Sequence, residues 1–492
     1  MTGRAHHPRT PLCAVAYFAV LAGSVTAGCG ASDDGQGRAD GCDAFDRLPC
    51  TCPGGALGFR ACAIGGVCRC DLGAAFAHSL GSGAALPTAA GVIPFPGDRA
   101  SYVFAEDIVR TYEVELAPED LARIDAQPRA EEYVPATLRF EGREYGPIGL
   151  RYKGSVGAFR PPCTRDGSGA KVAKCSVKLS FNWLDGDGSF YGLRKLNFHA
   201  MNNDPSMLRD RLAYRLFRDI GAPAPRAVHA LLRVNGEPWG LFALVEQVDG
   251  RFTRSRFADG GEGNLYKEVW PRYEQPEPYL AALKTNEDEG PSVAGMQAFK
   301  RAIDAGPDAM ATWLDMNHVM HLIAADRVMA NDDGLFHFWC AAPGQGNNVG
   351  ESGNHNYYWY EGRSAPRFWL IPWDMDLAFD GTPGVRLLGD WFAPGPCDCR
   401  NGRQTAPSCD PLIQHWTEWL WLYDKAVDAF ISGPFRQDRV DGMLDEWIEW
   451  IAPHVAESVA IDGAPDERSW RRGIAQLKDK IDELREHGGL RY

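Results

Sequence analysis

The sequence predicts an α+β fold, with a sheet-rich first half and a helical second half, preceded by a small disulfide-rich segment. Short runs in which apolar and polar residues alternate, separated by turn signals, fill much of 112–245. Longer runs with an apolar residue every three or four positions dominate 310–486. Six cysteines crowd into 42–70, and the 492 residues suffice for a two-lobed core.

The first half carries the strand and turn signals of a mostly antiparallel sheet. Asn235-Gly236 stands between two apolar runs and is a strong signal for a hairpin turn. Leu208, Leu212 and Leu216 recur on one face of a predicted helix that ends at Gly221. We expect strands at 112–116, 137–140, 148–152, 177–181, 230–234 and 239–245, a turn at 185–188, and helices at 118–126 and 204–220.

The second half is expected to be mainly helical. We expect helices at 310–329, 413–431, 440–459 and 469–486, and aromatic-rich strands at 357–360 and 368–372. A sheet-rich lobe of about 101–250, followed by a helix-rich lobe of about 251–492, is the layout of protein kinases. Layout alone does not establish function.

The N-terminus has the features of an export signal. Arg4 and Arg9 precede an apolar run at 12–25, which is too short to span a membrane and fits a signal peptide. Small residues before Cys29 resemble a bacterial lipobox, so we expect a signal peptide at 1–28 and a membrane-anchored lipoprotein of the cell envelope or outer surface, with a plain secretory signal as the alternative. We expect a tether at 29–41, a cysteine-rich module at 42–70, an Ala/Gly/Pro linker at 71–100 and the main domain at 101–492.

The cysteines agree with export to an oxidising compartment. Of the 14, Cys13 lies in the signal and Cys29 would be lipidated, which leaves an even number for disulfides. In the cysteine-rich module the close pairs have one intervening residue, whereas zinc pairs have about two to four, so disulfides are preferred over zinc. Two further sets are Cys163 with Cys175, and Cys340 with Cys397, Cys399 and Cys409. The formal net charge of -14 argues against a non-specific nucleic-acid-binding protein.

Several motifs follow one another in an order that resembles a known family. They are KLNF at 195–198, DPSMLRDRLAY at 204–214, GAPAPR at 221–226, NGEPWGL at 235–241, VEQVD at 245–249, GNLYK at 263–267, HNYY at 355–358 and IPWDMD at 371–376. Over roughly 101–460 the chain resembles the CotH family of secreted, protein-kinase-like proteins. The resemblance implies an atypical kinase fold that uses ATP and Mg²⁺ or Mn²⁺ to phosphorylate exported or surface proteins.

The resemblance assigns the acidic residues of these motifs to metal binding and proton transfer. Asp374 follows an apolar strand, as a kinase metal-binding aspartate does, and Asp376 is its possible partner. Asn356 resembles the amide that holds a second metal ion. Asp333 best matches the catalytic base, with Asp332 as the competitor, and taken alone both could cap a helix end.

The phosphate-binding residues follow from the same resemblance. Lys178, on an expected strand, is the best candidate for the phosphate-holding lysine, and Asp210 stands where the family usually has a glutamate. Lys153 and Ser155 belong to a stretch that resembles the family's phosphate-contacting turn. Glu246 ends the hairpin, where a hinge would contact adenine, and a structural carboxylate is the alternative.

Some signals are weaker, and two other functions stay open. His318 and His321 lie three apart on a predicted helix without a third ligand, so we expect both to be structural. A catalytically inactive binding or adhesion module on the cell surface could share the fold, but it would not need the acidic set. A nucleotidyl (AMP) transferase would use the same nucleotide and metal site, so the sequence does not separate it from a kinase.

Overall fold

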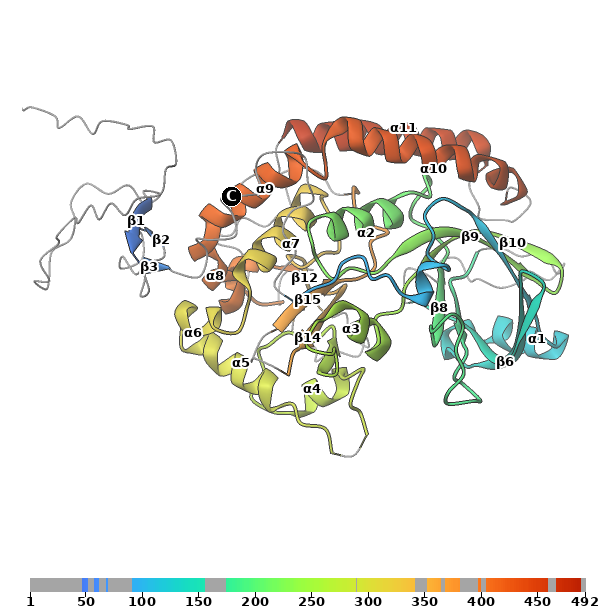
Figure 1. Ribbon diagram of the computed structural model, residues 1–492, viewed down its shortest axis with the longest axis horizontal. Coiled ribbons are helices and arrows are strands. Elements are labelled where there is room, and N and C mark those ends of the chain that lie inside the picture. Colours follow the sequence, from blue (N-terminus) through green and yellow to red (C-terminus); the bar gives the residue numbers. More distant parts are fainter. Residues whose placement is uncertain are drawn as a thin grey trace, which may run out of the picture.

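The computed structural model describes residues 91–154, 174–288, 290–340, 352–363, 368–380, 397–399, 404–458 and 466–487, together with the backbone of β1 (Arg47–Thr51), β2 (Leu57–Ala61) and β3 (Cys68–Arg69). These three strands form a small antiparallel sheet within the expected cysteine-rich module (Figure 1). The expected signal peptide, the lipidation site Cys29, Ser155 and Cys163 lie outside the described residues.

Seven strands of the first half close into a barrel (Figure 1). They are β4 (Arg110–Glu115), β5 (Val134–Phe140), β6 (Arg143–Tyr152), β7 (Val177–Ser180), β8 (Lys195–His199), β9 (Ala227–Val234) and β10 (Glu237–Val245), in the order β10-β8-β7-β6-β5-β4-β9. Neighbours pair antiparallel except β4 and β9, whose parallel pairing closes the barrel. The expected antiparallel sheet is confirmed, whereas its closure was not foreseen. The expected short helix is α1 (Pro118–Ala126).

The barrel interior follows from the two-residue period of its strands. In β5 the buried positions are Val134, Ala136, Leu138 and Phe140, and the residues between them are more exposed. The ring of Tyr112 on β4 lies 4.8 Å from that of Phe140 and 5.3 Å from that of Phe198, between ring centroids. Aromatic side chains therefore fill much of the barrel core.

The helical part surrounds a second, larger core. Its helices are α2 (Arg209–Asp219), α3 (Gly250–Arg256), α4 (Glu277–Ala282), α5 (Ala294–Asp304), α6 (Pro307–Ala311), α7 (Met316–Val328), α8 (Pro411–Trp416), α9 (Leu420–Ser432), α10 (Gln437–Ser458) and α11 (Glu467–Glu486). Two three-stranded sheets complete it, one of β11 (Asn264–Lys267), β14 (Tyr357–Glu361) and β15 (Phe368–Pro372), the other of β12 (Phe338–Cys340), β13 (Ser352–Gly353) and β16 (Gln404–Thr405). The mixed α+β class is confirmed.

Two of the expected helices begin at other residues than predicted. At each observed start an aspartate side chain accepts hydrogen bonds from backbone N–H groups. The predicted helix at 310–329 is two helices, since the carboxylate of Asp315 accepts from the N–H groups of Asn317 and His318 and begins α7. The helix predicted from residue 204 begins at Arg209, because Asp204 accepts from the N–H of Arg209 at 2.8 Å. The long helix expected at 413–431 is interrupted between α8 and α9.

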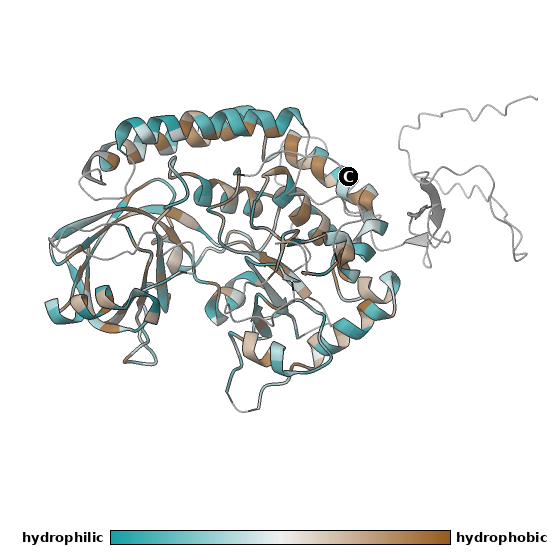
Figure 2. Ribbon diagram, turned by 180° about the vertical axis from the view of Figure 1, so that it is seen from behind, coloured by the Kyte–Doolittle hydropathy of each residue, from teal (hydrophilic) through white to brown (hydrophobic). Residues whose placement is uncertain are grey.

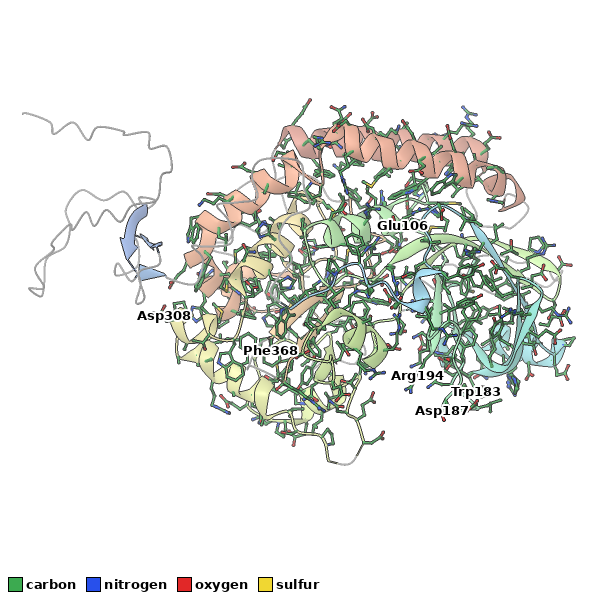
Figure 3. All side chains as sticks on the ribbon, viewed as in Figure 1. Glu106, Trp183, Asp187, Arg194, Asp308 and Phe368 are labelled. Carbon is green, nitrogen blue, oxygen red and sulfur yellow. A yellow bond between two sulfur atoms is a disulfide. The ribbon has the colours of Figure 1, made fainter. Side chains whose placement is uncertain are left out.

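The barrel and the helical part share the β9–β10 hairpin, and α2 packs against β9 from the helical side. Along β9, Val228 and Leu232 face the barrel core, whereas Ala227 and Leu231 face the helical core. Helix α2 follows a barrel strand in the sequence but packs in the helical core. Its Arg218 pairs at 2.7 Å with Glu106, which is labelled in Figure 3. Helix α10 reaches from the helical part over β10, and α11 lies along it with a largely hydrophilic outer face (Figures 1 and 2).

Disulfides tie the loops of the helical part. Cys340 pairs with Cys399, and Cys397 pairs with Cys409, which confirms the expectation for this set. Cys175 is disulfide-bonded as well. None of the helices in the described part of the chain combines the length and the hydropathy needed to cross a membrane.

Candidate active site

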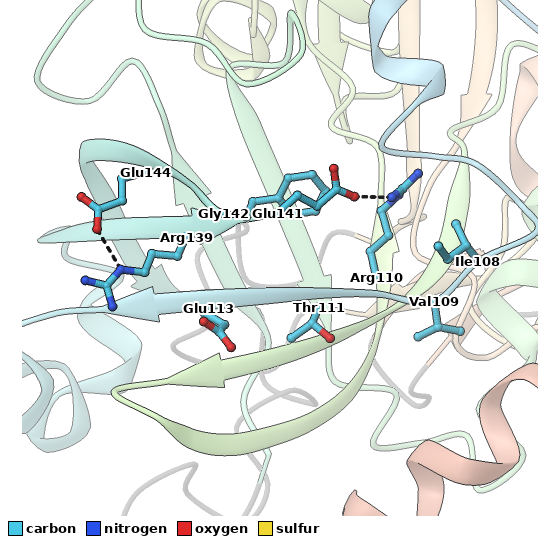
Figure 4. Close-up of a pocket in the computed structure, with 10 residues that line it drawn as sticks. Ile108, Val109, Arg110, Thr111, Glu113, Arg139, Glu141, Gly142 and Glu144 are labelled. Atoms are coloured by element: carbon cyan, nitrogen blue, oxygen red, sulfur yellow. Dashed lines mark hydrogen bonds and ion pairs between the residues drawn. The ribbon is translucent and has the colours of Figure 1, made fainter.

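Charged side chains from both parts of the molecule meet at a cavity of about 180 Å³ between the barrel and the helical part. It is lined by Lys153, Gly154, Ser176, His199, Ala200, Met201, Asn202, Asn203, Asp210, Asp333, Asn356, Asp374, Asp376 and Leu377. A larger cavity of about 540 Å³ lies on the outside of the barrel (Figure 4). There Arg110 pairs with Glu141 and Arg139 pairs with Glu144, so its arginines are already neutralised. The smaller cavity is the better candidate for chemistry because, within the described residues, its carboxylates form no ion pair with arginine or lysine.

Asp333 lies in the loop that follows α7, and its carboxylate is fixed from two sides. The indole N–H of Trp339 donates to Oδ1 at 2.6 Å, and the side-chain amide of Asn356 donates to Oδ2 at 2.9 Å. Burial raises the pKa of Asp333 above its ordinary value. Asp332 does not line the cavity, and its carbonyl accepts from His337 instead. Of these two aspartates, Asp333 is therefore the one that lines the cavity.

A buried aspartate that sequence reasoning missed holds this loop. Asp326, on α7, accepts at Oδ1 from the amide of Asn331 at 2.9 Å. A Cβ at Gly334 would collide with the Asp326 carboxylate, so only glycine fits there. Burial raises the pKa of Asp326 to about 6. A single aspartate between Ala325 and Arg327 on a helix carries no sequence signal for this role.

Asp374 and Asp376 follow β15 and enter the cavity from the helical part. Asp374 has a left-handed φ of 56°, and its N–H donates to the hydroxyl of Tyr214 at 2.9 Å, which holds this strained conformation. Its side chain is 45% exposed. Asp376 accepts from the amide of Asn203 at 2.9 Å, and burial, followed by the charges of Asp374 and Asp210, raises its pKa well above the ordinary value.

Asp210, on α2, completes a crowded group of carboxylates. It is 2% exposed, and burial, followed by the charge of Asp374, raises its pKa to about 8. Oδ1 accepts from the N–H of Met375 at 3.3 Å, whereas Oδ2 is buried without a hydrogen-bond partner. An orphaned buried oxygen among mutually repelling carboxylates is the environment that a divalent cation would stabilise.

The side chains of the cavity suit Mg²⁺, which needs few protein ligands, better than a metal ion whose ligands all come from the protein. Within the described residues, no three Asp, Glu, His or Cys side chains form a complete metal site. Mg²⁺ commonly takes one or two carboxylates and completes its shell with phosphate oxygens and water. Asp374, Asp376 and the amide of Asn356 are the residues that could hold it.

The structure places Lys153, rather than Lys178, in the cavity. The ammonium of Lys153 lies 2.9 Å from Nε2 of His199 and 5.7 Å from the ring centroid of Trp373. Lys178 on β7 pairs across the sheet with Arg151 and does not line the cavity. Burial, followed by the positive charge of Lys153, lowers the pKa of Lys178 well below its ordinary value. Of the two lysines, Lys153 is therefore the one that lines the cavity.

Glu246 lies outside the cavity and is a structural carboxylate. It is fully buried and accepts from Arg226 at 2.7 Å, from Arg251 at 2.5 Å and from Arg256 at 2.5 Å. Both carboxylate oxygens of Glu246 therefore accept hydrogen bonds from arginines, which agrees with a structural role rather than an adenine contact. His318 and His321 are buried and hydrogen-bond to backbone carbonyls, in agreement with a structural role.

The comparison with known families agrees with this site. The model of the CotH kinase protein family matches residues 150–491, which include every residue that lines the smaller cavity. The chain belongs to the CotH kinase family. The resemblance noted in the sequence is confirmed, and membership in the CotH family supports a kinase-related activity.

Two curated CotH-type relatives are similar to the chain. Inner spore coat protein H of Bacillus subtilis (strain 168) is 23% identical over 296 residues, which are 57% of this chain and 72% of that protein. An inner spore coat protein H-like protein of the same organism is 39% identical over 76 residues, which are 15% of this chain and 23% of that protein. Both similarities concern the family, and the substrate does not follow from either.

Proposed function

We propose that this CotH family member is an extracytoplasmic kinase with a two-lobed, kinase-like fold, which uses ATP and Mg²⁺ to phosphorylate Ser or Thr hydroxyls of exported or surface proteins. One observation carries the proposal: a lysine, an amide and four carboxylates meet in one cavity (Lys153, Asn356, Asp210, Asp333, Asp374 and Asp376). Phosphoryl transfer requires such a cation, metal-holding groups and a carboxylate near the substrate hydroxyl. An export signal and a lipid on Cys29 would anchor the kinase outside the cytoplasm.

The position of each residue in the cavity indicates its role in the proposed reaction. Asp374, Asp376 and Asn356 would hold Mg²⁺ or Mn²⁺, which supplies charge neutralisation of the phosphate oxygens when bound. Lys153, on the barrel side, binds phosphate oxygens through its ammonium. Asp333, on the helical side, faces the same space and meets the substrate hydroxyl.

In the transfer step the hydroxyl oxygen attacks the γ-phosphorus. The bond between that phosphorus and the β,γ-bridging oxygen breaks, ADP leaves, and the hydroxyl proton passes to the carboxylate of Asp333. The donors Trp339 and Asn356 hold both oxygens of Asp333, which fixes their orientation toward the acceptor. The raised pKa of Asp333 makes it a better proton acceptor than an exposed aspartate.

The test uses the full chain, purified with its disulfides intact, and γ-labelled ATP with Mg²⁺ and a Ser/Thr peptide library. We expect label on protein or peptide, and a loss of about 10²–10⁴-fold in rate for Asp333→Asn with ATP binding retained. Asp374→Asn is expected to lose Mg²⁺-dependent ATP binding. Asp288→Asn, in an exposed loop, is the matched control and should behave as the parent.

Other outcomes would replace the proposal. Absence of both label and ATP binding would favour the inactive cell-surface binding or adhesion module. Label that arrives from α-labelled but not γ-labelled ATP would favour the nucleotidyl (AMP) transferase.

A further inference from the structure

A buried histidine stands among the charged groups of the cavity. His199 ends β8 and is 5% exposed. Its Nε2 lies 2.9 Å from Nζ of Lys153, while its Nδ1 lies 3.6 Å from Oδ2 of Asp210 and 3.9 Å from Oδ1 of Asp374. The imidazole thus separates the ammonium from the carboxylates.

The chemistry of the two partners fixes the proton on the ring. An ammonium can only donate, so Nε2 of His199 accepts, and the neutral ring carries its proton on Nδ1, toward Asp210 and Asp374. Trp373 packs against the ring with centroids 5.7 Å apart and restricts its rotation.

This arrangement keeps the amino group of Lys153 out of direct contact with carboxylates, while burial lowers its pKa below the ordinary value. In the part of the chain that the structure describes, no carboxylate lies within 4.0 Å of its ammonium, and the near partner is the neutral imidazole. A lysine in direct contact with a carboxylate would be neutralised by it, whereas a lysine held by a neutral acceptor still attracts an anion.

We propose that His199 is a positioning residue, a spacer that holds Lys153 out of direct contact with Asp210 and Asp374 and aims its ammonium into the cavity toward a phosphate oxygen. The identity of that anion as a nucleotide phosphate rests on the proposed function. The inference that His199 separates Lys153 from the carboxylates depends only on the distances around the imidazole.

The first measurement is the affinity of the full chain for ATP. His199→Ala is expected to weaken binding about tenfold, as for the loss of one hydrogen bond to a charged group. His199→Gln can place its amide oxygen near the former Nε2 and should stay within about threefold of the parent, whereas the shorter His199→Asn should resemble His199→Ala. Because His199 acts through Lys153, the double variant with Lys153→Met should bind no more weakly than Lys153→Met alone.

The second measurement needs no nucleotide. Acetic anhydride modifies lysine amines, and mass spectrometry can compare Lys153 with the exposed Lys284 in the same sample. Lys153 should react several-fold faster in His199→Ala than in the parent or His199→Gln, because its nitrogen loses its acceptor. His318→Gln, which replaces a buried histidine outside the cavity, is the matched control and should leave Lys153 unchanged.

The two measurements distinguish failure of the spacer from failure of the proposed function. Additive losses in the double variant, parent-like affinity of His199→Asn, or unchanged acetylation of Lys153 would each overturn the spacer, even if the parent transfers phosphate. Faster acetylation in a chain that binds no ATP would support the spacer and overturn the proposed function.

Discussion

Replacement of the buried Asp210 by asparagine should stabilise the protein in the absence of metal while it impairs phosphoryl transfer. The carboxylate is 2% exposed, and burial raises its pKa from 3.8 to about 8. Between these two values the folded protein keeps a proton that the unfolded chain has already lost. The contribution of Asp210 to the free energy of unfolding is therefore highest below pH 3.8 and falls as the pH rises to about 8.

The magnitude follows from the interval between the two pKa values. One pH unit corresponds to about 1.4 kcal/mol, and roughly three units separate the unfolded pKa from neutral pH, which gives an upper bound of about 4 kcal/mol at pH 7. Relaxation around neighbouring charges reduces this figure, so we expect a gain of about 2 kcal/mol for Asp210→Asn. The amide can still accept from the N–H of Met375, so that hydrogen bond is retained.

The assay is urea unfolding of the full chain with EDTA at pH 5 and at pH 7.5. The gain for Asp210→Asn should be larger at the higher pH, and saturating Mg²⁺ with ATP should reduce it, since bound cation offsets the repulsion in the parent. Asp219→Asn is the matched control with the opposite sign, because that buried carboxylate is paired with Arg215 at 3.0 Å and Arg439 at 2.6 Å. A variant less stable than the parent at both pH values would refute the reasoning.

Two further predictions concern stability away from the cavity. Although burial alone would raise the pKa of Glu246, its arginine neighbours hold it well below the ordinary value, so Glu246→Gln should cost about 3–5 kcal/mol in urea unfolding with ATP affinity retained; a loss below about 1 kcal/mol would contradict this. The Cys340–Cys399 disulfide closes a separation of 59 residues, so replacing both cysteines by serine should lower the free energy of unfolding by up to about 4 kcal/mol. Thermal and urea unfolding under non-reducing conditions would measure it, and an unchanged midpoint would argue that the loop is held by other contacts.

The sequence motifs identified most of the carboxylates that line the cavity, but they did not show which of the two lysines lies there. The motifs that contain Asp333, Asn356, Asp374 and Asp376 lie close to one another in the sequence, and the fold brings all four side chains to one cavity. Lys178 lies on β7 and Lys153 directly follows β6, and only the packing of the helical part decides which one reaches the cavity. Local patterns carry no information about that docking.

Period-two runs and the Asn235-Gly236 turn predicted six of the seven barrel strands, because alternation and turn conformation are local properties, whereas β8 was not predicted as a strand. The family motifs likewise determined which acidic residues to consider. Tertiary structure alone decided the rest: the parallel pairing of β4 with β9 that closes the barrel, and the burial that changes the charge state of Asp210. It also decided the place of His199 between ammonium and carboxylates. These features depend on distances between residues far apart in the chain, and desolvation and Coulomb forces act through such distances rather than through sequence neighbours.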